Sequence, residues 1–361
     1  MRTVITILTV LFIVSIFPTV GQAAPNVSAN NAVLIEQSTG RVLFEKNAND
    51  RASIASITKI MTALIAIESG KMDEKAKTSR EAIYTEGSSI YLEQGEKMKL
   101  EDLVYGLMLR SGNDAAVSIA EHVGASEEGF VFLMNEKAKW LGMNNTNFEN
   151  PHGLDSDNHY SSAYDMAILM RYAMQNEQFR TITGANSYRS ENRSYSWVNK
   201  NKLLTQLYEP TNGGKTGFTK KTGRTLVSSA SKDGMDLIVV TLNAPDDWQD
   251  HINLYEWGFD HYKLETLSKE GDVTYKLNNS EEVSGYVTEE IKYPLTQDEQ
   301  QALKKKTYLL DPGENMDIIG KTVFEIGDEQ LIETPIHREK KGNIGSTVLT
   351  MYKKLVGISK W

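Results

Sequence analysis

The chain has 361 residues, of which 40% are hydrophobic and 24% are charged. This composition suits a folded protein of roughly two domains, and it excludes a disordered or collagen-like chain. Because 39 lysine and arginine residues stand against 48 aspartate and glutamate residues, the net charge is −9 and a nucleic-acid partner is excluded. The sequence contains no cysteine, which excludes disulfides, thiolate metal sites and a cysteine nucleophile.

The first residues predict an export signal. Arg2 precedes an apolar run over residues 4–20, and Gly21, Ala23 and Ala24 follow at the position of a signal-peptidase site. The alternative is an uncleaved membrane anchor, since a run of about 17 residues lies at the short limit for crossing a bilayer. We favour cleavage because the small residues are present. Residues 1–23 are therefore set aside as a signal peptide, and we expect the protein to act outside the cytoplasm.

Residues 24–263 predict a first domain of the α+β class, because strands at both ends of this segment enclose a mostly helical region. A Gly-containing turn joins two strands near the start, and Ser231-Lys-Asp-Gly234 predicts a hairpin near the end. The predicted strands cover 31–36, 41–44, 215–218, 224–230 and 236–242. The predicted helices cover 56–69, 100–109, 114–123, 126–141 and a segment around 252–259.

Residues 264–340 predict a small all-β domain. Short alternating strands at 273–277, 283–287, 307–310 and 322–326 are separated by Asn, Asp, Gly and Pro. Residues 345–361 predict an amphipathic helix with apolar residues mostly on one side and lysines toward the other. We favour a membrane-anchoring helix that lies in the headgroup region, with Trp361 at the interface. The alternative is a terminal helix packed on the β domain.

The familiar motifs of several enzyme classes are missing. The sequence has no Gly-x-Ser-x-Gly elbow, no phosphate-binding loop and no His-Glu-x-x-His zinc helix. None of its six histidines forms a ligand pair at helical spacing. We therefore expect neither a metal nor another cofactor.

Ser56-Ile-Thr-Lys59 at the start of a predicted helix offers a nucleophile and its base. Side chains three positions apart lie on one helix face, so the lysine amine can reach the serine hydroxyl. A lysine among apolar neighbours has a lowered pKa and can act as a neutral base. The same spacing occurs in Ser229-Ala-Ser-Lys232, but that string leads into an exposed hairpin turn, so we choose Ser56.

Two further motifs are weak when taken singly. Ser111-Gly-Asn113 lies between two predicted helices, and its alternative interpretation is a simple helix-capping turn. Lys215-Thr-Gly217 begins a predicted strand, where Gly217 suits close approach of a substrate backbone and the lysine suits a carboxylate. A second Lys-Thr-Gly at Lys221 lies in the following loop.

Together, and in this order, the three motifs are specific. With spacings of 55 and 104 residues, they resemble those of penicillin-binding proteins and serine β-lactamases. Further strings are similar to the low-molecular-weight D-alanyl-D-alanine carboxypeptidases of Bacillus-like bacteria, and the resemblance covers essentially the whole mature chain. These strings span residues 55–63, 150–155, 158–161 and 212–219. The resemblance implies a penicillin-binding protein/β-lactamase-like domain, a sheet flanked by a helical region, followed by a small all-β domain.

The resemblance also implies roles in proton transfer. Ser56 would be the nucleophile that is acylated, and Lys59 would be the base that activates it. Ser111 would pass the proton to the leaving D-alanine, and Asn113 would hold the substrate amide. The implied reaction removes the terminal D-alanine from peptidoglycan stem peptides, with β-lactams as inhibitors that acylate the same serine irreversibly.

Substrate binding is implied for the third motif. Lys215 and Thr216 would bind the terminal carboxylate, with Gly217 beside them. The backbone N–H groups of Ser56 and Phe218 would form the oxyanion hole. The implied location is the outer face of the cytoplasmic membrane or the cell wall.

Two departures and three alternatives accompany this resemblance. Residues 243–248 lack the arginine with which many relatives clamp the carboxylate, and Tyr164 replaces a usual arginine. We expect His152 to be structural support under the site.

A β-lactamase is disfavoured because no Glu-x-x-Leu-Asn string lies between the second and third motifs. A catalytically silent peptidoglycan-binding protein is a second alternative, and transpeptidation uses the same residues.

Overall fold

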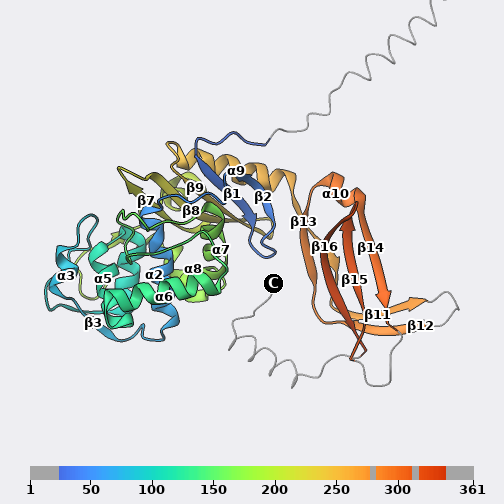
Figure 1. The fold of residues 1–361 in the computed structure, drawn as a ribbon, viewed down its shortest axis with the longest axis horizontal. Coiled ribbons are helices and arrows are strands. Elements are labelled where there is room, and N and C mark those ends of the chain that lie inside the picture. The colour runs from blue at the N-terminus through green and yellow to red at the C-terminus, as the bar shows by residue number, and fades with distance from the viewer. Residues whose placement is uncertain (1–23, 277–281, 311–316, 339–361) are drawn as a thin grey trace, which may run out of the picture.

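The computed structural model describes residues 24–276, 282–310 and 317–338. The predicted signal peptide and the predicted C-terminal helix lie outside these residues. Figure 1 shows a part built from a sheet and helices, and a second part built almost wholly from strands. This arrangement confirms the α+β class and the all-β region near the C-terminus.

The first part contains a five-stranded antiparallel sheet in the order β2-β1-β9-β8-β7. Its strands are β1 (Asn31–Glu36), β2 (Val42–Lys46), β7 (Thr211–Thr219), β8 (Gly223–Lys232) and β9 (Met235–Leu242). Asp233 and Gly234 join β8 to β9 with φ of 53° and 80°, which is the two-residue turn that favours a hairpin. Segments from both ends of the chain therefore pair within one sheet, and β7 is left at an edge.

Alternating residues of the sheet face two different cores. Val33, Ile35 and Val227 pack with the helical region on one face. Leu34 and Leu226 pack on the other face against α9 (Asp247–His261). The sheet is thus the middle of three layers, and β7 forms one edge of it.

The helices predicted in the helical region are present with two local changes, and the structure adds helical segments at Arg80–Tyr84, Ala163–Ala173, Glu177–Thr183 and Leu203–Leu207 that were not predicted. The predicted helix at 56–69 begins as a 3-10 turn, and the predicted helix at 100–109 ends in a turn of π-helix. The helical elements are η1 (Ala55–Thr58), α2 (Lys59–Glu68), α3 (Arg80–Tyr84), α4 (Leu100–Tyr105), η2 (Gly106–Arg110), α5 (Asn113–Gly124), α6 (Glu127–Trp140), α7 (Ala163–Ala173), α8 (Glu177–Thr183) and η3 (Leu203–Leu207). Two small ribbons join them: β3 (Lys75–Lys77) with β4 (Lys97–Lys99), and β5 (Ser187–Tyr188) with β6 (Trp197–Val198).

The second part contains a two-stranded ribbon and a five-stranded sheet in the order β11-β12-β16-β15-β14. The ribbon pairs β10 (Lys263–Ser268) with β13 (Ile291–Leu295), and α10 (Gln297–Ala302) follows it. The sheet consists of β11 (Gly271–Lys276), β12 (Glu282–Val287), β14 (Leu303–Leu309), β15 (Ile318–Ile326) and β16 (Glu329–His337). Arg41 of the first part binds Glu299 of α10 and stacks on Tyr262 and Tyr293. Among the helices that the structure describes, none is long and apolar enough to cross a membrane.

Candidate active site

Ser56 lies in the 3-10 turn η1 and lines a cleft of about 480 Å³. The residue before it, Ala55, has a left-handed backbone with φ of 50°. Thr58 Oγ1 donates to the Ala55 carbonyl over 2.8 Å and also contacts His159 Nε2 at 2.8 Å. Burial lowers the pKa of His159 to about 4, so its neutral ring braces this turn at neutral pH. The turn that carries Ser56 is therefore stabilised by the contacts of Thr58 with Ala55 and His159.

Lys59 is fully buried, and its amine contacts three oxygens. Its Nζ lies 3.0 Å from Ser56 Oγ, 2.8 Å from Asn113 Oδ1 and 2.5 Å from the His152 carbonyl oxygen. Burial and the charge of Lys215 hold the pKa of Lys59 well below its ordinary value. A neutral amine donates two hydrogens to the two carbonyl-type oxygens, which leaves its lone pair for the Ser56 hydroxyl. This arrangement suits a general base.

Ser111 occupies the joint between η2 and α5. Its φ of 64° is left-handed, and its Oγ accepts a hydrogen bond of 3.1 Å from Lys215 Nζ. Asn113 begins α5, and its Nδ2 donates to the Glu86 carbonyl while its Oδ1 faces Lys59. Both predicted residues of this motif are buried; Asn113 contacts Lys59, and Ser111 lines the same cleft as Ser56.

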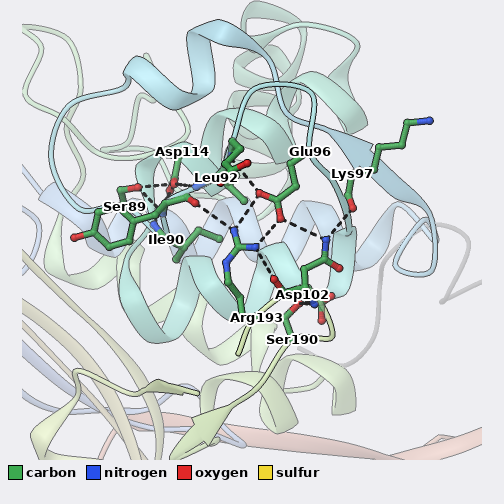
Figure 2. Close-up of polar contacts among 12 residues, drawn as sticks. Ser89, Ile90, Leu92, Glu96, Lys97, Asp102, Asp114, Ser190 and Arg193 are labelled. Atoms are coloured by element: carbon green, nitrogen blue, oxygen red, sulfur yellow. Dashed lines mark hydrogen bonds and ion pairs between the residues drawn. The ribbon is translucent and has the colours of Figure 1, made fainter. Parts of the chain in front are cut away.

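A network of polar contacts holds the loop over residues 86–97 (Figure 2). The Glu86 carbonyl of this loop accepts the hydrogen bond from Asn113 Nδ2. Asp114 accepts from Ser89 Oγ and from the backbone N–H groups of Ile90 and Leu92. Arg193 forms a bidentate pair with Glu96 at 2.6 and 3.1 Å. Although burial opposes it, hydrogen bonding by Arg193 keeps the pKa of Glu96 below its ordinary value. The loop over 86–97 is therefore fixed beside Asn113.

The third motif lies on β7, against the turn that carries Ser56. Lys215 is buried, and burial together with the charge of Lys200 lowers its pKa to about 7. A Cβ atom at Gly217 would lie 2.9 Å from the backbone nitrogen of Ser56, so this position requires glycine. Thr216 and Phe218 both line the cleft, and Phe218 is 65% exposed.

His152 and Gly153 lie directly beneath η1. The His152 carbonyl accepts from Lys59, and its ring Nδ1 accepts from the backbone N–H of Leu154. Burial and the charge of Lys59 lower the pKa of His152 to about 3, so the ring is neutral. Its contacts are those of a supporting residue, as the sequence predicts.

The second Ser-x-x-Lys string lies elsewhere. Ser229 Oγ is buried and hydrogen-bonds to Asn212, whereas Lys232 lies at the end of β8, 3.6 Å from Glu256. The second Lys-Thr-Gly string falls in the turn after β7, where Thr222 donates to Asp155. Neither string brings a serine and a lysine together.

The cleft also contains residues that sequence reasoning missed. They come from segments that carry no catalytic motif, and two of them lie in the segment noted for its missing arginine. They are Ser88, Lys200, Arg224, Asp247 and Trp248. A lysine–serine hydrogen bond of 3.2 Å joins the first two. Within the described residues, no three His, Asp or Glu side chains gather as metal ligands would.

The fold and this set of contacts define a serine hydrolase of the penicillin-binding type. The family model of D-alanyl-D-alanine carboxypeptidases, peptidase S11, matches residues 19–246. The chain belongs to this family.

Known relatives agree with this assignment along most of the chain. D-alanyl-D-alanine carboxypeptidase DacF of Bacillus subtilis is 35% identical, with 91% of this chain and 89% of the relative covered. DacC of Escherichia coli is also 35% identical, with 68% and 65% covered. The crystal structure of penicillin-binding protein 5 from Haemophilus influenzae superposes with a TM-score of 0.77 at 26% identity, covering 89% of this chain and 99% of the other.

Proposed function

We propose that the protein removes the terminal D-alanine of peptidoglycan stem peptides through an acyl-enzyme on Ser56. Ser56 Oγ attacks the carbonyl carbon of the penultimate D-alanine while Lys59 Nζ takes the hydroxyl proton. The backbone N–H groups of Ser56 and Phe218 stabilise the oxyanion. The carbon–nitrogen bond then breaks, Ser111 passes the proton to the departing amine, and free D-alanine leaves.

The second half of the reaction regenerates the serine. Water attacks the ester carbonyl, the shortened peptide leaves with the new carboxylate, and the proton returns to Ser56 Oγ. Asn113 holds the substrate amide, and Lys215 and Thr216 hold the terminal carboxylate. The observation that carries this proposal is the buried Lys59 amine, which lies 3.0 Å from Ser56 Oγ.

Release of D-alanine tests the proposal. We expect the purified protein to liberate one equivalent of D-alanine from a stem pentapeptide and to leave the tetrapeptide, as measured by mass spectrometry. A silent peptidoglycan-binding protein would retain the peptide without shortening it, and this result would contradict the proposal. Release of D-alanine coupled to an added amine acceptor would instead indicate transpeptidation.

We also infer that the protein acts outside the cytoplasm and is attached to the membrane surface by residues 345–361. The support is the apolar and basic pattern of this segment and the export signal expected at 1–23. Deleting residues 347–361 should move the protein from the membrane fraction to the soluble fraction while D-alanine release is unchanged. Continued membrane association of the truncated, signal-cleaved protein would refute the anchor.

A further inference from the structure

A tyrosine with an unusual backbone conformation lies near the catalytic cleft. Tyr91 has a left-handed backbone with φ of 60°, and it is 78% exposed. A bulky residue at positive φ is an outlier, and such outliers concentrate at functional sites. Its neighbours Ile90 and Leu92 are buried, so Tyr91 alone turns outward at this point of the loop.

Hydrogen bonds fix the backbone of Tyr91. Its N–H donates to Ser89 Oγ over 2.7 Å, and its carbonyl accepts from Arg193 Nη2 over 3.3 Å. The N–H groups of the two neighbouring residues both donate to Asp114. The exposed ring therefore extends from a fixed backbone, so a ligand that packs on it orders little of the chain and loses little affinity to entropy.

Arg193 connects this loop to the loop between β5 and β6 (Figure 2). Hydrogen bonding by Glu96 raises the pKa of Arg193, and the Tyr195 side chain adds to this effect. Tyr195 follows in the same loop and is 48% exposed. One guanidinium thus contacts the backbone of Tyr91 and lies near the side chain of Tyr195.

The loop between β5 and β6 is fixed by a buried carboxylate. Asp102 is 3% exposed, and it accepts from Ser190 Oγ over 2.8 Å and from the Tyr188 hydroxyl. On β6, Val198 is 56% exposed, and its carbonyl accepts from Arg110 Nη1. We call Tyr91, Tyr195 and Val198 the rim surface.

The rim surface adjoins the catalytic cleft. Ser88 and Lys200 both line the cleft, and Lys200 Nζ donates to Ser88 Oγ over 3.2 Å. Because Tyr91 lies three residues from Ser88 and Tyr195 lies five from Lys200, the tyrosines lie within about 11 and 18 Å of the cleft. An extended peptide of four residues spans about 14 Å. A polymer with a peptide branch in the cleft can therefore place its main chain on the rim surface.

Fixed and exposed tyrosines suit a saccharide. Each offers an apolar ring face and a hydroxyl group, which match the C–H face and the hydroxyl groups of a sugar ring. The residues between Arg193 and Trp197 other than Tyr195 are exposed serines, so a wholly apolar partner is disfavoured. Glu96 balances the charge of Arg193, so a polyanion is disfavoured as well.

We propose that the rim surface binds the glycan strand of peptidoglycan while a stem peptide occupies the cleft. This inference rests on the proposed function, because the substrate peptide is a branch of that polymer. The rim surface favours polymeric peptidoglycan over free peptides and takes no part in breaking the bond.

Glycan strands freed of their stem peptides test this inference, because they lack the peptide that the cleft binds. We expect the wild type to bind these strands in calorimetric titration, and to bind them equally after acylation by penicillin. Tyr91→Asn/Tyr195→Ser should weaken binding by about 10-fold or more, since one aromatic contact contributes a factor of about 2 to 10. Asparagine suits the left-handed backbone at position 91.

Kinetics provide a second readout. The double variant should release D-alanine from a soluble pentapeptide at the wild-type rate, whereas kcat/KM for polymeric peptidoglycan should fall by about 10-fold. Acylation by penicillin at the wild-type rate checks that the variant is folded. Tyr308→Ser is the matched control, because Tyr308 is 52% exposed on β14 in the second part. It should behave as the wild type in both assays.

The outcomes separate this inference from the proposed function. Equal binding of the strands by the wild type and the double variant would overturn the inference, as would an equal loss in Tyr308→Ser. Slower release of D-alanine from the soluble peptide, or a dimer that dissociates in the double variant, would assign the tyrosines another role and overturn it too. Absence of D-alanine release by the wild type would overturn the proposed function, whereas glycan binding that still depends on the two tyrosines would support the rim surface.

Discussion

Replacing Lys59 with alanine should lower the rate of acylation by penicillin by about 1,000-fold or more, since general-base catalysis contributes roughly 100- to 10,000-fold. The Lys59 amine lies 3.0 Å from Ser56 Oγ, and the structure places no second lysine amine in contact with that oxygen among the described residues. The serine hydroxyl would then have to lose its proton without a neighbouring base. The measurement is the rate at which the intact mass increases by one penicillin.

Lys232→Ala is the matched control for this prediction. It removes the lysine of the other Ser-x-x-Lys string, which lies at the end of β8 beside Glu256. Acylation by this variant should equal that of the wild type. Lys59→Met, which keeps the volume of the buried side chain, should fail to acylate as Lys59→Ala does. A fast reaction in both Lys59 variants would show that Lys59 is not the base.

Replacing Gly153 with alanine should damage both stability and acylation. Gly153 has φ of 87°, and its added Cβ would overlap the Ala55 carbonyl and lie 2.9 Å from Thr58 Oγ1. Both contacts belong to the turn that presents Ser56, so the turn must shift. We expect a loss of about 3 kcal/mol in the free energy of unfolding, from overpacking and the left-handed backbone together. Denaturant unfolding and the acylation rate measure the two effects.

Gly142→Ala separates the overlap from the backbone strain. Gly142 also has positive φ, at 77°, but an added Cβ would meet nothing within 4 Å. This variant should lose about 1 kcal/mol and acylate at the normal rate, because it bears only the cost of the left-handed backbone. Equal behaviour of the two variants would mean that Gly153 does not hold the Ser56 turn.

The elements with strong local signals could be predicted from the sequence. The hairpin of β8 and β9 has an Asp-Gly turn between apolar strands, and α6 begins where the predicted helix 126–141 does, with Ser126 as its N-cap. The strands that escaped prediction in the second part include β13 and β16, which contain Pro294 and Pro335. Proline and polar residues weaken the strand pattern, and only the pairing with neighbouring strands makes these segments extended.

The candidate site also contains residues that could be predicted from the sequence and residues that could not. The three motifs predict which side chains carry chemistry. In the structure Lys59 contacts Ser56 and Asn113, Lys215 contacts Ser111, and Ser56 and Ser111 line the same cleft. Arg224 could not be predicted, because its place in the cleft depends on strand register and on Asp247 at the start of α9. Residues that act through long-range packing leave no local pattern.

The most direct test of the central claim is a time course of intact mass for the purified protein mixed with excess penicillin, with free penicillin quantified in parallel. The account predicts a single long-lived adduct on the wild type and on Ser229→Ala, and none on Ser56→Ala. Rapid consumption of penicillin without an accumulating adduct would indicate a β-lactamase. An adduct that persists in Ser56→Ala would contradict the assignment of Ser56 as the nucleophile.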